Sequence, residues 1–210
     1  CRASQSSRFA TSLGLYGNTA VIGADLYKPT DDDGKSKGAA FLYRKTENTW
    51  DELRILTPHD PVEGQRFGAA VSIWGGTVVV GAPDDVGGCS GDRCDSVGAA
   101  YVFSEARRGW TETAKLFASD GQYNANFGHS TALHGNRAVV GAPTDQRDGA
   151  YRGAAYLFEE SNGNWAEKAK LIANDSGHAD NFGVTVAHCC NTVAVGAPGH
   201  DLSEDLYDAG

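Results

Sequence analysis

The chain has 210 residues, is 40% hydrophobic, contains 27 glycines and carries a formal net charge of −9. Its length is enough to bury a core, its glycine content favours turns over long helices, and its negative charge argues against a nucleic-acid partner. The longest apolar run, residues 77–82, suits a strand and is far shorter than the roughly 18 residues of a membrane helix.

Taken in chain order, the sequence repeats one set of four marks. The first mark begins with a phenylalanine, and its copies follow at intervals of 58, 60 and 55 residues: Phe9, Phe67, Phe127 and Phe182. The second mark is an apolar pair followed by Gly-Ala, at residues 21–25, 79–83, 139–143 and 194–198. The third is Gly-Ala-Ala followed by two larger apolar residues, at 38–42, 98–102 and 153–157. The fourth is a tryptophan six residues before a leucine, with an aspartate four residues further on: Trp50, Leu56, Asp60; Trp110, Leu116, Asp120; Trp165, Leu171, Asp175.

Each repeat predicts four short strands. In the second repeat they are residues 68–73, 77–82, 99–105 and 111–117, rich in Val, Tyr, Phe and Thr and bounded by turn residues. A four-stranded antiparallel sheet cannot bury both faces alone, so the repeats must stack on one another. Four strands per repeat at this period predict the blades of an all-β propeller. The predicted blades are residues 8–65, 66–125, 126–180 and an incomplete 181–210.

The last residue, Gly210, aligns with Gly38, Gly98 and Gly153, where the third strand of a blade begins. The sequence therefore predicts three complete blades and half of a fourth. The chain also starts at Cys1 and contains no methionine. We expect it to be part of a longer polypeptide with a propeller of six or seven blades. The alternative is that neighbouring copies supply the missing strands.

The Phe-Gly and Gly-Ala-Pro marks resemble FG-GAP repeats, which are known from the propeller of integrin α chains, from integrin-like lectins and from secreted repeat proteins. The resemblance covers essentially the whole chain and implies a secreted or cell-surface protein. It implies a non-enzymatic binding or structural module in an adhesion, matrix or filament protein. Such a module would bind other protein chains or glycans. The alternatives are a carbohydrate-binding lectin and an accessory domain of a larger secreted enzyme. The sequence contains no recognisable catalytic motif, so we expect no catalytic residues.

Most acidic residues fall in the predicted loops between the second and third strands and between blades. Clustered carboxylates near glycine suit Ca²⁺, which takes six to eight oxygen ligands. The candidate ligands are Asp31, Asp33, Asp84, Asp85, Asp145, Asp148, Asp201 and Asp205. The alternative is that aspartate serves here as a turn former. In integrins, calcium sites occupy the turns between strands one and two, and the corresponding turns here (16–18, 74–76, 134–136 and 189–191) hold no carboxylate.

The remaining candidates are cysteines, one sequon and the tryptophans. Cys89 and Cys94 predict a local disulfide, with free thiols or half of a metal site as alternatives, while Cys1, Cys189 and Cys190 have no assigned partner. Disulfides and the sequon at Asn174 fit an oxidising, extracellular compartment. We expect the periodic tryptophans to pack between blades and Trp74, in a tight turn, to be an exposed contact residue. The six histidines form no recognisable ligand pattern.

Overall fold

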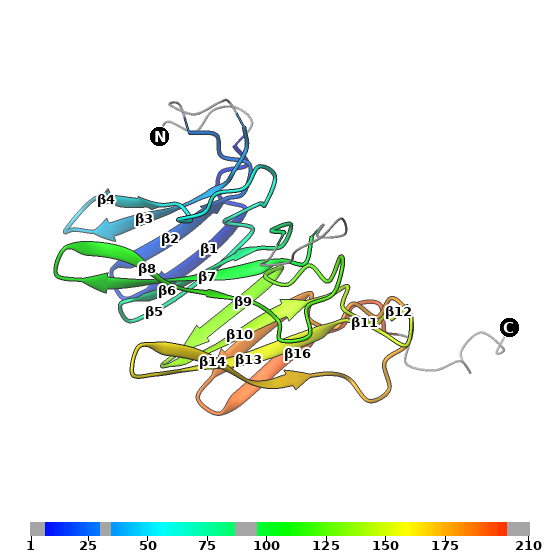
Figure 1. Ribbon diagram of the computed structural model, residues 1–210. Helices are drawn as coiled ribbons and strands as arrows, with labels where there is room; N and C mark the ends of the chain where they lie inside the picture. Colours follow the sequence, from blue (N-terminus) through cyan, green and yellow to red (C-terminus); the bar gives the residue numbers. More distant parts are fainter. Residues whose placement is uncertain (1–6, 30–34, 87–95, 201–210) are drawn as a thin grey trace, which may run out of the picture.

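The computed structural model describes residues 7–29, 35–86 and 96–200. All regular structure in these ranges is β-strand (Figure 1). None of the described segments is a helix that could cross a membrane.

The strands form three four-stranded antiparallel sheets and two two-stranded sheets. Strands within each four-stranded sheet follow the chain order, apart from a small hairpin inserted between the second and third strands of the third sheet. We call the three four-stranded sheets and the last two-stranded sheet the first to fourth blades. The first blade contains β1 (Ser12–Tyr16), β2 (Thr19–Ala24), β3 (Ala39–Lys45) and β4 (Trp50–Leu56). The second contains β5 (Ala70–Trp74), β6 (Thr77–Ala82), β7 (Ala99–Ala106) and β8 (Gly109–Leu116). The third contains β9 (Ser130–His134), β10 (Arg137–Ala142), β13 (Ala154–Ser161) and β14 (Asn164–Leu171). The fourth contains β15 (Thr185–Cys189) and β16 (Thr192–Gly196). A small hairpin of β11 (Gln146–Arg147) and β12 (Ala150–Tyr151) lies in the loop between β10 and β13 of the third blade.

The blades succeed one another in a fan around a common side (Figure 1). The first strand of each blade lies next to the first strand of the following blade, so β1 contacts β5, β5 contacts β9, and β9 contacts β15. This arrangement, with each sheet running outward from its first strand to its fourth, is that of a partial β-propeller and confirms the predicted fold class.

The glycines of the repeat mark places where two blades touch backbone to backbone. A Cβ on Gly81 of β6 would lie 1.9 Å from the carbonyl oxygen of Gly128, the glycine of the next Phe-Gly pair. The corresponding distance from Gly141 to the Gly183 oxygen is 2.0 Å. Only glycine permits this approach. The repeated Phe-Gly and Gly-Ala marks are therefore the two halves of one contact between blades.

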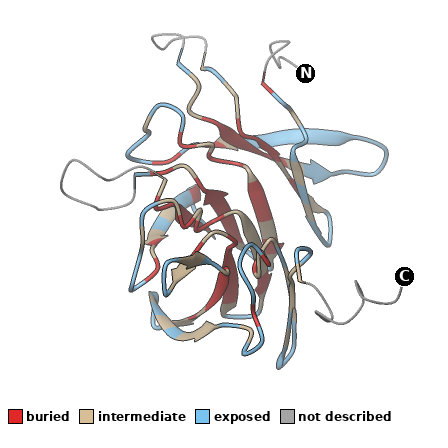
Figure 2. Ribbon diagram, turned by 90° about the vertical axis from the view of Figure 1, so that its right-hand side faces the viewer, coloured by how far each residue is buried: buried red, intermediate tan, exposed pale blue. Residues whose placement is uncertain are grey.

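Burial follows the stacking of the blades, and the middle strands are buried on both faces (Figure 2). Ile73 and Leu133 occupy matching positions of β5 and β9, and both are 7% exposed, whereas the equivalent Leu15 of β1 is 64% exposed. The first blade lies at one end of the described stack, and no described blade covers this face.

The periodic tryptophans show the same dependence on a preceding blade. Trp110 is buried in a core that contains Leu56 of the first blade, and Trp165 packs against a core that includes Leu116 of the second. Trp50 of the first blade is 46% exposed. The predicted packing role is confirmed at the two positions where the structure describes a preceding blade.

Candidate functional site

Two matching clusters of ionisable side chains join successive blades. Between the first and second blades, the Tyr101 hydroxyl lies 2.7 Å from Asp85 Oδ2 and 3.1 Å from Asp60 Oδ1. The ammonium of Lys115 donates to Asp60 Oδ2 at 2.7 Å and lies 3.3 Å from Asp85 Oδ2. Asp60 comes from the loop after β4, and the other three residues belong to the second blade. The cluster therefore fixes the inter-blade loop to the blade that follows it.

The junction between the second and third blades repeats this geometry. Tyr156 lies 2.8 Å from both Asp120 Oδ1 and Asp145 Oδ2. Lys170 donates to Asp120 Oδ2 at 2.6 Å and to the two oxygens of Asp145 at 2.9 and 3.0 Å. The side chain of Asp145 is fully buried, so these donors take the place of water as its hydrogen-bond partners. We call this set of four residues the third-blade quartet.

The environment of the quartet fixes the protonation of its members. Burial and the carboxylates of Asp145 and Asp120 raise the pKa of Tyr156, which keeps the hydroxyl protonated as a donor. Burial opposes the ionisation of Asp120, but hydrogen bonds from Lys170 and Tyr156 and the lysine charge outweigh it and lower the Asp120 pKa. Burial likewise disfavours the charge on Lys170, whereas Asp120 and Asp145 favour it and raise its pKa. Asp120 and Lys170 therefore stabilise each other's charged form while Tyr156 stays neutral, as expected of a structural network.

The first blade has an apolar cluster at the same place. Tyr27, Phe41 and Ile55 occupy the positions of Asp145, Tyr156 and Lys170. Phe41 packs edge-on against Tyr27 and against Phe9, with 5.3 Å between ring centroids in each pair. All three ionisable positions of the blade are thus replaced together by hydrophobic residues.

A second repeated contact holds the same inter-blade loops. Glu112 of β8 accepts the backbone N–H of His59 at 2.8 Å, and Glu167 of β14 accepts that of Ser119 at 2.9 Å. Each glutamate immediately precedes the extra residue of a β-bulge, which the fourth strand contains in every complete blade. The bulge lets the strand present its glutamate toward the preceding blade.

Of the predicted calcium ligands, Asp85 and Asp145 belong to these two separate clusters. Asp84 lies 3.8 Å from the guanidinium of Arg66 and accepts a hydrogen bond from Asn126 at 3.3 Å. Burial raises the Asp84 pKa even though the Arg66 charge opposes the shift.

Asp148 is exposed and begins the Asp-Gly turn between β11 and β12, with a φ of 52°. Such two-residue turns favour Asp-Gly for its left-handed backbone, so this residue has a turn-forming role.

Several predicted residues lie outside the described ranges. They are Asp31, Asp33, Asp201, Asp205, Cys89 and Cys94, together with Cys1. The sequon residue Asn174 is exposed, whereas Trp74 is only partly exposed and stacks against neighbouring rings.

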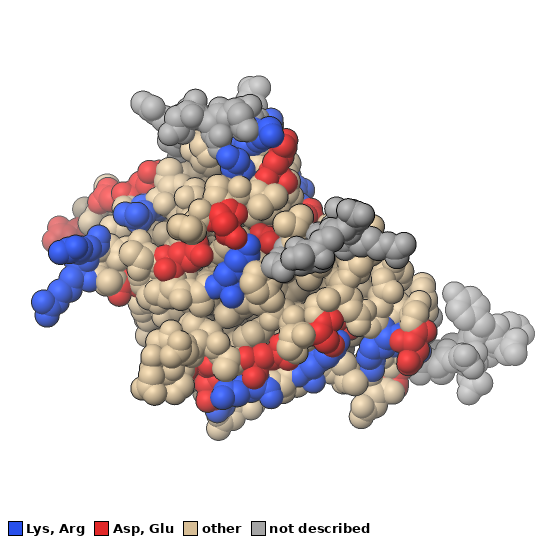
Figure 3. Space-filling view, in the orientation of Figure 1, with Lys and Arg blue, Asp and Glu red and all other residues tan. Residues whose placement is uncertain are grey.

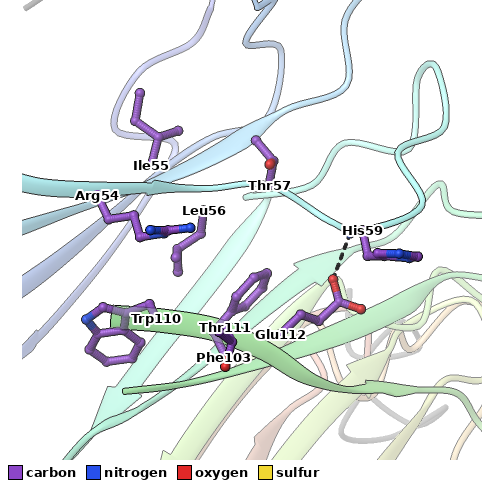
Figure 4. Close-up of a pocket in the computed structure, with 9 residues that line it drawn as sticks. All are labelled: Arg54, Ile55, Leu56, Thr57, His59, Phe103, Trp110, Thr111 and Glu112. Atoms are coloured by element: carbon purple, nitrogen blue, oxygen red, sulfur yellow. Dashed lines mark hydrogen bonds between the residues drawn. The ribbon is translucent and has the colours of Figure 1, made fainter. Parts of the chain in front are cut away.

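A pocket of about 360 Å³ lies in the outer groove between β4 and β8 (Figure 4). Its floor is apolar and includes the buried side chains Leu56, Phe103 and Trp110. Its rim carries polar groups from both blades: Arg54, Thr57, His59, Thr111 and Glu112. The His59–Glu112 hydrogen bond closes one end of the groove (Figure 4). An apolar floor with a few convergent polar groups is typical of a ligand site.

Three of the five rim residues are not part of the repeat. At the next groove, between β8 and β14, the positions of Arg54, Thr57 and Thr111 are occupied by Ala114, Phe117 and Ala166. The buried floor residues, in contrast, have the equivalents Leu116, Phe158 and Trp165. The first groove therefore keeps the packing residues of the repeat and adds polar groups of its own. Sequence analysis missed them because they are the positions at which the repeats differ.

The charges of the described surface are more balanced than the net charge suggests. Acidic and basic side chains lie side by side on the face shown in Figure 3. Carboxylates of the inter-blade loops pair with basic residues, as Asp60 does with Lys115, Asp120 with Lys170 and Glu63 with Lys35. Much of the acidity predicted for these loops is therefore neutralised in the fold.

The stacked four-stranded sheets and their backbone contacts define the protein as a β-propeller. The FG-GAP repeat family matches the chain at residues 50–103, 110–158 and 165–210, and the chain belongs to this family. FG-GAP repeats are typical of extracellular proteins. A comparison with curated proteins found no match.

Proposed function

We propose that the chain is a non-enzymatic, extracellular binding module that uses the groove between its first two blades to hold a ligand. The observation that carries this proposal is the polar rim of Arg54, Thr57 and Thr111, which surrounds a repeated apolar floor and is absent from the next groove. Packing between blades does not require this rim, since the second and third blades pack without it. The stacked blades provide a rigid frame on both sides of the site.

The proposal that the module is not an enzyme rests on how its ionisable groups are used. The lysines, tyrosines and buried aspartates of the blade junctions hold each other and the inter-blade loops. The pocket rim itself carries one carboxylate, Glu112, which already accepts the backbone N–H of His59.

Two ligand classes suit the groove, a protein side chain and a glycan. The volume is near the lower end of the range for small-molecule sites, about 300–1,000 Å³, and suits one sugar ring or one side chain. A lectin function is favoured by Arg54, Thr111 and Glu112 on the rim, because charged groups and hydroxyls bind the hydroxyls of a sugar. A protein ligand would use Arg54 as a typical interface anchor.

Screening on a glycan array and against purified extracellular proteins tests the proposal. Arg54→Ala and Thr57→Phe, which introduce the residues of the second groove, should each weaken binding by about tenfold or more, or about 1.4 kcal/mol. Lys168→Ala removes an exposed charge on β14, outside the groove, and should leave binding unchanged. A ligand whose affinity is indifferent to both groove variants would refute the assignment of the site.

We also propose that another blade covers the open face of the first blade, supplied by the rest of a longer polypeptide or by a neighbouring copy. Leu13 and Leu15 of β1 are 68% and 64% exposed there, and Trp50 is 46% exposed. The oligomeric state of the wild-type chain and of Leu15→Asp, measured by sedimentation, tests whether a neighbouring copy supplies the blade. Self-association that the variant abolishes indicates a neighbouring copy, whereas a monomeric chain excludes that source.

Secretion, glycosylation at Asn174 and calcium binding by the acidic loops are part of the same proposal. Exposure of Asn174 supports the glycosylation site. Expression through a secretory pathway, followed by mass spectrometry with and without glycosidase, tests it. A mass unchanged by the glycosidase would remove the glycan from the proposal.

A further inference from the structure

The turns between the first and second strands of the blades meet in a row. Their first residues are Tyr16, Trp74, His134 and Cys189. Trp74 contacts Tyr16 on one side and His134 on the other, with ring centroids 4.9 and 4.0 Å apart. The row continues into the fourth blade, where the backbone N–H of Cys190 donates to Nδ1 of His134 at 3.3 Å.

The fourth turn departs from the other three in a way that backbone geometry does not favour. In the first three blades the second residue of the turn is a glycine with φ between 55° and 61°: Gly17, Gly75 and Gly135. Cys190 takes the place of glycine with a φ of 57°. A left-handed backbone costs a residue with a side chain about 1–2 kcal/mol. A strained residue where glycine is the rule suggests a functional constraint.

This substitution completes a cluster of soft metal ligands. The Sγ atoms of Cys189 and Cys190 are 3.2 Å apart, and both thiols are exposed. A nitrogen of His134 and the two sulfur atoms all lie within 4.8 Å of one another. In tetrahedral zinc sites with Zn–S of about 2.3 Å and Zn–N of about 2.0–2.1 Å, ligand atoms lie about 3.5–3.8 Å apart. The separations in the structure, from 3.2 Å between the sulfur atoms to at most 4.8 Å, bracket these values.

We propose that His134, Cys189 and Cys190 bind a thiophilic transition-metal cation, of which Zn²⁺ is the representative. Thiolate and imidazole ligands select such cations over Ca²⁺, so the site is chemically distinct from the proposed acidic-loop sites. The three side chains leave one tetrahedral position for water or for a donor of a bound partner. Because His134 belongs to the third blade and both cysteines to the fourth, the metal links two neighbouring blades at their first strands.

The test is a titration of the reduced, metal-free chain with Co²⁺ and then Zn²⁺. Wild-type protein should bind one Co²⁺ with sulfur-to-metal charge-transfer absorption, and Zn²⁺ should displace it. Cys190→Gly restores the residue of the other turns, and His134→Tyr restores the Tyr16 of the first blade. Since even outer-shell changes weaken metal sites by about 10–100-fold, each variant should weaken Zn²⁺ binding by about 100-fold or more. The double variant Cys89→Ser with Cys94→Ser is the control and should bind as the wild type does.

Several outcomes would overturn the proposal. One is the absence of charge-transfer absorption in the reduced wild-type protein. A second is an unchanged affinity in His134→Tyr or Cys190→Gly, measured on variants whose circular dichroism shows that they are folded. A third is loss of the signal in the Cys89/Cys94 control. Finally, a disulfide between Cys189 and Cys190 in the chain secreted from cells would assign these residues to a covalent link in place of a metal.

Discussion

Replacement of Lys170 by isoleucine tests whether the third-blade quartet acts as a unit. Ile55 is the residue that the first blade carries at this position. The substitution removes the ammonium that lies 2.9 and 3.0 Å from the oxygens of Asp145, whose side chain is fully buried. Breaking a buried ion pair in this way costs about 3–5 kcal/mol. For a chain of this size, 1 kcal/mol corresponds to about 2–4 °C, so Tm should fall by about 6–20 °C.

The matched variant changes the three members of the quartet that belong to the third blade and keeps Asp120, whose side chain is 46% exposed. Combining Lys170→Ile with Asp145→Tyr and Tyr156→Phe introduces the Ile55, Tyr27 and Phe41 arrangement of the first blade. Exchange of buried ionic groups for packed hydrophobic residues is often neutral or stabilising, so the triple variant should recover most of the lost Tm. Thermal unfolding followed by circular dichroism measures both effects.

Lys168→Ile, at an exposed position of the same strand, is the control and should change stability by less than about 0.5 kcal/mol. A triple variant no more stable than Lys170→Ile alone would refute the reasoning. So would a single variant whose Tm falls by less than about 2 °C.

Three further predictions concern stability. Gly81→Ala forces a Cβ against the next blade and should lower the free energy of unfolding in urea by about 3 kcal/mol or more. The added Cβ of Gly135→Ala meets no atom within 4 Å, so this variant should lose only the cost of a left-handed backbone, about 1–2 kcal/mol. Equal losses would contradict the backbone contact between Gly81 and Gly128. The folded pKa of Asp120 is lowered, so the stability that its ionised carboxylate contributes is present above the unfolded pKa of about 3.9 and is lost as the pH falls through the folded pKa. The free energy of unfolding in urea, measured between pH 7 and 3, should therefore depend less on pH in Asp120→Asn than in the wild type. An unchanged pH dependence would count against this assignment. Calcium bound by the acidic loops should raise Tm in proportion to the logarithm of its concentration above the dissociation constant, and an identical Tm in EDTA and in millimolar Ca²⁺ would exclude stabilisation by such binding.

The fold could be predicted from the sequence because each repeated mark corresponds to a contact that admits one residue type. Glycine recurs at positions such as 81 because the carbonyl of Gly128 lies where a side chain would begin. The large apolar residues of the repeat recur because every blade must fill the same space against its neighbour. Such constraints act on single positions at a fixed period, and they are visible in one sequence.

The quartets and the groove could not be predicted in the same way, because they depend on which residues of different loops meet. Asp120 and Asp145 come from two loops, and their shared partners Tyr156 and Lys170 lie on two strands. A signal was present, since aspartate, tyrosine and lysine occur together in two blades and are all replaced in the first. The rim residues Arg54, Thr57 and Thr111 carry no periodic signal.

The cluster at the fourth turn illustrates a different limit. His134 and Cys189 are 55 residues apart, a separation that matches no known ligand spacing, and the histidines showed no pattern in the sequence. They are nevertheless equivalent positions of adjacent repeats. In a propeller, equivalent turns are neighbours in space, so residues one repeat apart should be compared as if they were adjacent.

The two chemistries of the blade junction also bear on how such repeats diverge after duplication. Between the ionic set and the aromatic set, the order of single substitutions matters, because loss of Lys170 first leaves the buried carboxylate of Asp145 without its ion pair. Replacement of Asp145 first leaves only a lysine whose side chain is 21% exposed. The junction residues are therefore expected to change in a restricted order, whereas the groove residues can change one at a time.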